Sequence, residues 1–161
     1  MELKKEIVRL LKEDARFSPS KIAAILGKSE EEVRKTIHEL EDSGVIVKYR
    51  TVVNEEKLFD NYVEALVEIK VNPQRTKGYD EIAEMLVQFP EIRSLYLFSG
   101  GFDFAMFVEG KSIKEVAFFV NERLSVLDCV SSTTTNFVLK KYKSEGMPFY
   151  EAEEPKRQEL F

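Results

Sequence analysis

The sequence has no tryptophan, one cysteine and one histidine among its 161 residues. Because Cys129 stands alone, the chain can form neither an internal disulfide nor a cysteine-cluster zinc site, and we expect Cys129 to be a small core residue. His38 by itself cannot anchor a metal site or a catalytic triad. The sequence therefore predicts no metal site and no cofactor, and phenylalanine, with 12 copies, supplies the aromatic packing.

A long apolar run and an excess of positive charge are also missing. The first residues, MELKKEIVRLLKEDAR, are too charged for a signal peptide, and no apolar run is long enough to span a bilayer. We therefore expect a cytoplasmic protein that makes no contact with a membrane. The net charge of −5 argues against a protein that coats nucleic acid through bulk positive charge, but it permits a small DNA-reading module with local basic residues.

The composition is that of a soluble protein with a core, since 43% of the residues are apolar and 33% are charged. The length is enough for one ordinary domain or two small ones. Residues 1–60 carry 12 basic and 13 acidic side chains, whereas residues 61–161 carry 12 and 16. The first part of the chain is therefore the less acidic one.

The stretch 18–44, SPSKIAAILGKSEEEVRKTIHELEDSG, has the pattern of two short helices joined by a tight turn. Ser18 can cap the first helix, and Gly27 can end it in a turn that needs positive φ. Ser29 can cap the second helix, with Glu32 three residues on completing a capping box. Apolar residues are spaced so that each helix buries one face: Ile22, Ala23, Leu26, Val33, Ile37 and Leu40.

An amphipathic helix precedes this pair, with Leu3, Ile7, Leu10 and Leu11 on one face. Three such helices form a helix-turn-helix domain. The second helix of the pair in residues 18–44 is the one that enters the major groove of DNA. We therefore expect a helix-turn-helix domain with a winged-helix-like character over residues 1–50. A β-branched run over 45–53 predicts a strand or wing, and residues 51–61 are expected to be a linking strand and hinge.

Residues 62–142 predict a second domain with the order β-α-β-β-α-β. The expected strands are 62–71, 92–98, 102–108 and 130–139, and the expected helices are 78–89 and 112–124. This order indicates a ferredoxin-like α+β domain, with one antiparallel sheet and both helices on one face. Because the other face stays bare, we expect a homodimer.

The C-terminal tail, residues 143–161, mixes basic, acidic and aromatic residues without a period. Two interpretations stay open for it. It is either an arm onto a neighbouring subunit, anchored by Phe149 and Tyr150, or a frayed terminus.

The order of these parts resembles the Lrp/AsnC (feast/famine) family of regulators. The resemblance covers about residues 3–141 and is carried by short matches in order: Asp14-Ala15-Arg16, Ile22-Ala23, Leu26-Gly27, Leu40-Glu41, Gly44-Val45-Ile46, Tyr49, Asn54, Ser99-Gly100-Gly101-Phe102-Asp103-Phe104, Val130, Thr133 and Thr135. The family implies a DNA-binding transcription regulator whose second domain pairs into dimers. It further implies assembly into tetramers or octamers and a small-molecule effector, usually an amino acid.

Arg34, Lys35 and His38 are expected on the outward face of the second helix of the pair, where they can contact double-stranded DNA. The alternative is that Arg34 and Lys35 pair with Glu30 and Glu31, each four residues earlier, which is the stabilising direction in a helix. Further phosphate contacts are expected from nearby hydroxyl and basic residues: Ser18, Ser20, Lys21, Lys28, Ser29, Lys48 and Arg50.

Gly100, Gly101 and Asp103 also have two interpretations. They form either a hairpin whose glycines take unusual φ and whose aspartate caps the turn, or a loop that grips an amino acid by its ammonium and carboxylate ends. The resemblance implies that the effector lies at this loop. Thr133 and Thr135 can add hydroxyls to such a site. The alternative for these two threonines is that they are simply good strand formers.

Three functions compete at this point. The first is a DNA-binding regulator that responds to an effector. The second is an effector-sensing or assembly module with weak or no operator reading, which the acidic run at residues 30–32 favours. The third is an enzyme like the siroheme decarboxylases, which resemble this family. The absence of histidine and the presence of only four arginines in residues 61–161 argue against it.

Overall fold

The computed structural model describes residues 1–72 and 78–149. The chain forms two compact units, one made by Met1–Val52 and one that begins at Val53. Each unit has its own buried core. No helix in the described part of the chain is long and apolar enough to cross a membrane.

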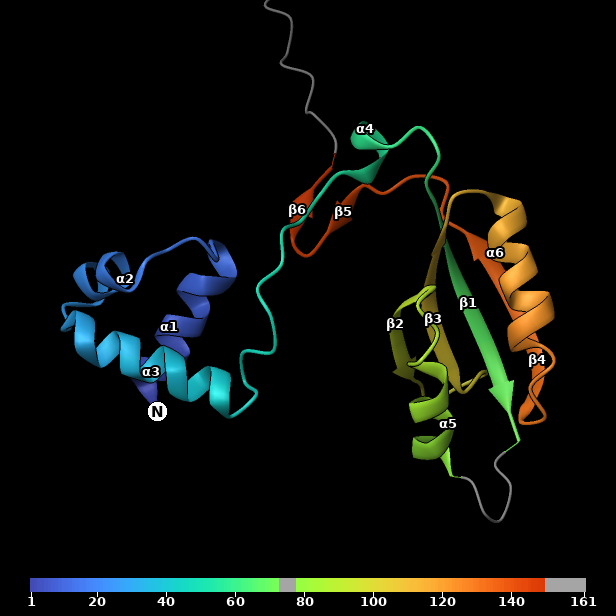
Figure 1. Ribbon diagram of the computed structural model, residues 1–161, viewed down its shortest axis with the longest axis horizontal. Helices are drawn as coiled ribbons and strands as arrows, with labels where there is room; N and C mark the ends of the chain where they lie inside the picture. The colour runs from blue at the N-terminus through green and yellow to red at the C-terminus, as the bar shows by residue number, and fades with distance from the viewer. Residues whose placement is uncertain (73–77, 150–161) are drawn as a thin grey trace, which may run out of the picture. The chain divides into compact units, whose positions relative to one another are not determined.

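The first unit contains three helices, α1 (Glu2–Glu13), α2 (Pro19–Leu26) and α3 (Glu30–Asp42) (Figure 1). Ser18 Oγ accepts a hydrogen bond from the Lys21 amide, and Ser29 Oγ accepts one from the Glu32 amide. Gly27 ends α2 with a φ of 61°, a left-handed conformation in which a side chain would be strained. The prediction of a helix-turn-helix is therefore confirmed, together with both caps and the turn.

The core of the first unit is the apolar face that the spacing predicts. Its fully buried members come from all three helices: Ile7, Leu10, Ile22, Ala23, Val33 and Leu40. Ile37 is only partly buried, whereas Thr36 is buried. A buried Thr36 hydroxyl is tolerated because it donates a hydrogen bond to the Glu32 carbonyl.

The segment between α1 and α2 contains an ion pair. Hydrogen bonds from Arg16 lower the pKa of Asp14 to about 2.

The prediction of a strand or wing over residues 45–53 is wrong. These residues are irregular and mostly exposed, with Val47 88% exposed. A β-branched run becomes a strand only when a neighbour completes its backbone hydrogen bonds, and within the described residues no strand pairs with it. The expected linking strand and hinge, 51–61, instead contains the short helix α4 (Glu55–Leu58).

The second unit is a four-stranded antiparallel sheet with two helices. The elements follow in the order β1 (Val63–Val71), α5 (Tyr79–Leu86), β2 (Ile92–Leu97), β3 (Phe104–Gly110), α6 (Ile113–Phe119) with a π-helical turn η1 (Val120–Leu124), and β4 (Val130–Phe137). The strand order in the sheet is β2-β3-β1-β4 (Figure 1). The prediction of a ferredoxin-like βαββαβ domain is confirmed.

Alternation along β1 divides the sheet into two faces. Ala65, Val67 and Ile69 are buried with residues of both helices, and Cys129 packs partly buried against the same core, as expected. The opposite surface, which we call the open face, is covered by neither α5 nor α6. Its rows follow from the strand register: Leu66, Phe107 and Ser94 in one row, and Glu68, Ala105 and Tyr96 in the next.

Of the two interpretations of the tail, fraying does not apply to residues 143–148. They form a small hairpin of β5 (Lys143–Ser144) and β6 (Met147–Pro148). Glu145 and Gly146 make the turn with φ values of 49° and 82°, and two successive positive φ values are typical of the turns that close two-residue hairpins. Tyr150 and the rest of the tail, 150–161, lie outside the described residues.

Candidate nucleic-acid interface and effector loop

The outward face of α3 carries the basic side chains that the spacing predicts. Arg34, Lys35 and His38 are all exposed. With Glu31 and Glu41 they line an open groove of about 600 Å³ beside the start of α2. The structure therefore brings the three predicted DNA-contacting residues onto one accessible surface.

Acidic neighbours compete for these cations. Arg34 Nη2 lies 2.5 Å from Glu30 Oε1, so the expected pairing within the helix is present for Arg34. His38 Nε2 lies 3.7 Å from Asp42 Oδ2. Exposed ion pairs of this kind stabilise a protein by about 0–1 kcal/mol. Replacing the Glu30 carboxylate by a phosphate therefore costs little, and the pairing does not prevent Arg34 from contacting DNA.

The further phosphate candidates are spread over the same unit. The hydroxyls of Ser18 and Ser29 already accept amide hydrogen bonds as helix caps, which leaves their protons free to be donated. Lys21 Nζ lies 3.9 Å above the Phe17 ring, and Lys28 Nζ lies 3.7 Å from Glu32 Oε1. The remaining candidates are exposed, one on α2 and two in the irregular segment after α3: Ser20, Lys48 and Arg50.

The glycines of the predicted effector loop lie between β2 and β3, where they are exposed. The expectation that they take unusual φ is wrong, because Gly100 and Gly101 are not among the described glycines with positive φ. A Cβ added at either position would meet no atom within 4 Å. The space beside each glycine Cα is therefore open, where a side chain would otherwise stand.

The Asp103 carboxylate does not cap its own turn, contrary to one of the two interpretations. It instead links the start of β3 to β1 and α5. Its Oδ2 accepts from the Val71 amide at 2.8 Å, at the end of β1, and its Oδ1 accepts from the Tyr79 hydroxyl at 3.2 Å, at the start of α5. This hydrogen bond to the carboxylate is also the main reason that the pKa of Tyr79 is raised. Tyr79 therefore lies beside the effector loop. The sequence does not reveal this contact, because 24 residues separate Tyr79 from Asp103.

The two threonines do not join this loop directly. Thr133 lies opposite Ile69 and Thr135 opposite Val67, so both belong to the helix-covered side of β4. β1 separates β4 from β3, which places the two strands about 10 Å apart. Thr133 is at the same end of the sheet as Asp103, whose amide donates to the Ile69 carbonyl, and Thr135 is two residues further along.

Comparisons with known proteins agree with this architecture. The Lrp/AsnC ligand-binding domain matches residues 64–148, and the winged helix-turn-helix DNA-binding domain matches residues 2–47. The HTH-type transcriptional regulator YugG of Bacillus subtilis is 40% identical over 157 residues, which cover 97% of this chain and 95% of that protein. The regulator LrpA of Pyrococcus abyssi is 33% identical over 88% of this chain and 98% of its own.

Solved structures show the same fold at lower identity. The Neisseria meningitidis regulator NMB0573, solved as a complex with L-Met, has a TM-score of 0.75 at 19% identity and covers 92% of this chain and 96% of its own. AsnC of E. coli has a TM-score of 0.71 at 20% identity, over 89% and 95%. These relatives are transcriptional regulators and not enzymes. With matches to both domains and over nearly its whole length, the chain is a member of the Lrp/AsnC family of transcriptional regulators.

Proposed function

We propose that this regulator binds operator DNA through α3, with Arg34 and Lys35 as its principal contacts and His38 beside them. The observation that carries the proposal is the exposure of these cations along one open groove, on the helix that a helix-turn-helix inserts into the major groove. A cytoplasmic place for operator reading is part of the same proposal.

The test replaces both cations in an Arg34→Ala, Lys35→Ala variant. Binding to DNA upstream of the protein's own gene should weaken more than about tenfold, and the slope of log affinity against log salt should fall by about two, since each lost phosphate contact removes about 0.9. A gel shift over a series of salt concentrations measures both quantities.

The matched control is Lys5→Ala, Lys12→Ala, which removes the same charge from exposed positions of α1 in the same unit. Equal losses from the two pairs would mean that α3 does not read DNA. In that case the alternative of an effector-sensing or assembly module, favoured by the Glu30–Arg34 pair, would take its place.

We further propose that the loop from Gly100 to Asp103 holds an effector with an amino group, most simply an amino acid. The open space beside Gly100 and Gly101 leaves room for a carboxylate to approach the backbone, and the Asp103 carboxylate suits an ammonium. The L-Met complex of a relative with this fold supports the class of ligand. Thr133 lies at the same end of the sheet but across β1 from the loop, and Thr135 lies further away, so neither is part of the proposed site.

We also propose that the protein is at least a homodimer, built through the open face of the sheet, and that dimers assemble further into tetramers or octamers. Leu66, Phe107 and Tyr96 give that face an apolar centre flanked by polar side chains. An apolar centre with a polar rim is the usual composition of a protein interface.

A further inference from the structure

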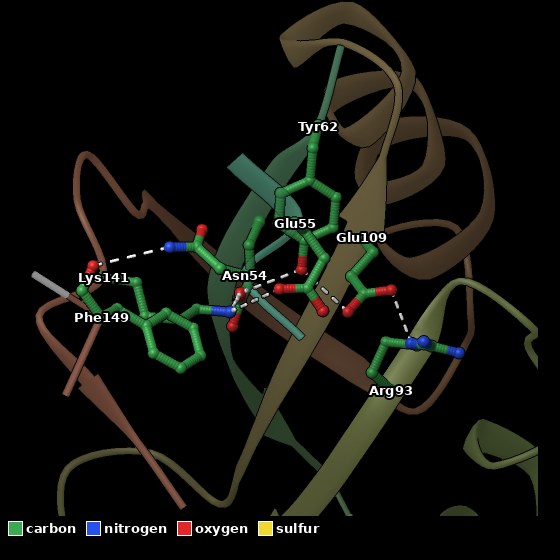
Figure 2. Close-up of polar contacts among 8 residues, drawn as sticks. Asn54, Glu55, Tyr62, Arg93, Glu109, Lys141 and Phe149 are labelled. Carbon is green, nitrogen blue, oxygen red and sulfur yellow. Dashed lines mark hydrogen bonds and ion pairs between the residues drawn. The ribbon is translucent and has the colours of Figure 1, made fainter. Parts of the chain in front are cut away.

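The second unit holds a group of charged and polar side chains that neither DNA binding nor the effector loop uses (Figure 2). Glu64 and Glu109 lie directly opposite each other on β1 and β3. Lys141 follows β4, and Glu55 belongs to α4. We call this group the Lys141 cluster; its members are Glu55, Tyr62, Glu64, Arg93, Glu109 and Lys141.

Lys141 connects the start of the second unit to the sheet. Its Nζ lies 2.6 Å from Glu64 Oε2 on β1 and 3.9 Å from Glu55 Oε2 on α4. The Lys141 side chain is 20% exposed and that of Glu64 is 12% exposed. Because solvent and salt reach these atoms poorly, their attraction is screened less than that of a surface pair.

Within the Lys141 cluster, no other side chain can take the place of Lys141 in neutralising Glu64. The hydroxyl of Tyr62 lies 3.1 Å from Glu64 and 2.9 Å from Glu109, but its one proton is donated to one carboxylate at a time. Burial and the hydrogen bond to Glu109 raise the pKa of this tyrosine. Arg93 is already paired with Glu109 at 2.5 Å. Without Lys141, the largely buried Glu64 side chain would stay next to two further carboxylates, those of Glu55 and Glu109.

The C-terminal hairpin closes over the same lysine. The rings of Tyr62 and Phe149 have their centroids 5.7 and 5.8 Å from Lys141 Nζ. The Phe149 amide donates to the Tyr142 carbonyl, and the Phe149 carbonyl accepts from Asn54 Nδ2 at 3.5 Å. The space left between these residues is about 10 Å³, about the size of one water molecule. The hairpin is therefore packed closely against the segment that enters the second unit.

We propose that Lys141 is a positioning residue that fixes the entry segment, residues 53–59, to the sheet. The β5–β6 hairpin covers Lys141 and holds the entry segment through Asn54. The entry segment joins the DNA-binding unit to the second unit. Where it is fixed sets how much free chain connects the two units. Loss of the contacts in the Lys141 cluster would lengthen the free chain that leads to the DNA-binding unit. In the dimer proposed above, this would change the effective concentration of the second DNA-binding unit at paired half-sites.

Hydrogen–deuterium exchange on the full chain tests this proposal without any DNA. The amides of Lys57 and Phe59 report on the entry segment, because they donate to the carbonyls of Asn54 and Glu55 at the two ends of α4. In Lys141→Met, which keeps the length but removes the charge, exchange over residues 53–59 should rise at least about tenfold. Exchange over β1 should stay unchanged.

Two comparisons decide the outcome. The control Lys140→Met alters the neighbouring exposed lysine, which lies over the Tyr142 ring, and should exchange like the wild type. Lys141→Arg keeps the charge and should restore slow exchange. Equal exchange in the two methionine variants would overturn the proposal, as would a rise that includes β1 and β3, since that marks general destabilisation. An arginine variant that exchanges as fast as Lys141→Met would also overturn it.

Discussion

At the scale of the residue, Asp103 is held between two donors from other elements, and this decides what its substitution tests. The Val71 amide needs an acceptor, which a carbonyl oxygen can supply as well as a carboxylate. The Tyr79 hydroxyl oxygen can accept from an amide NH₂ as readily as its proton can be donated. Asparagine therefore keeps both contacts and removes only the negative charge.

We expect Asp103→Asn to melt close to the wild type and to bind an amino-acid effector more weakly by about 1.5–3 kcal/mol, the cost of losing a charge-assisted hydrogen bond. Calorimetric titration with a panel of amino acids, alongside a thermal melt, measures both effects. Asp103→Ala is the contrasting variant, since it abandons both donors and should lower the melting temperature. Unchanged affinity in Asp103→Asn would mean that the effector lies elsewhere.

At the scale of the element, α3 depends on its cap. Its first turn holds three glutamates, which favour the positive end of the helix dipole, and Ser29 Oγ satisfies one of the free amides there. The helix carries both the core residues Val33 and Leu40 and the exposed cations. Loss of the cap should therefore weaken the packing of the DNA-binding unit. It should also disturb the position of the exposed cations on α3.

We expect Ser29→Ala to destabilise the first unit by about 1 kcal/mol, the usual cost of removing a serine cap. Ser20→Ala, which removes an exposed hydroxyl from within α2, should be neutral. Chemical denaturation followed by the helix signal distinguishes the two. If both variants unfolded at the same denaturant concentration, the Ser29 cap would contribute nothing to stability.

At the scale of the whole molecule, the open face is where a second copy should bind. Phe107 lies at its centre, opposite Leu66 on β1 and Ser94 on β2. A charge placed there would have to be buried without a partner in a dimer, which is costly. Phe118 offers the matched comparison, because it is 65% exposed on α6, on the helix side of the sheet.

We expect Phe107→Lys to be monomeric at micromolar concentration, while the wild type and Phe118→Lys are dimers or larger. Light scattering measures the molar mass, and the melting temperature checks that the variants are folded. A monomeric wild type would refute the dimer, and loss of assembly in Phe118→Lys alone would move the interface to the helix side.

The sequence by itself determined the features that depend on neighbours along the chain. A cap needs a serine three residues before the amide it accepts from, and the Gly27 turn needs one residue free of a Cβ. Alternation along β1 follows from the period of a strand. For these reasons the three helices, the βαββαβ order and most of the core of the first unit could be predicted. The exposed face of α3 followed from the same helical period.

Only the tertiary structure decided what depends on residues brought together from afar. Residues 45–53 have the composition of a strand, but a strand also needs a partner. Asp103 meets Tyr79 from 24 residues away, and the register of β4 turns Thr133 and Thr135 towards the helices. Lys141 reaches Glu64 across 77 positions of sequence. No local pattern encodes these pairings, because each distance is set by how the strands align and where the last hairpin folds back.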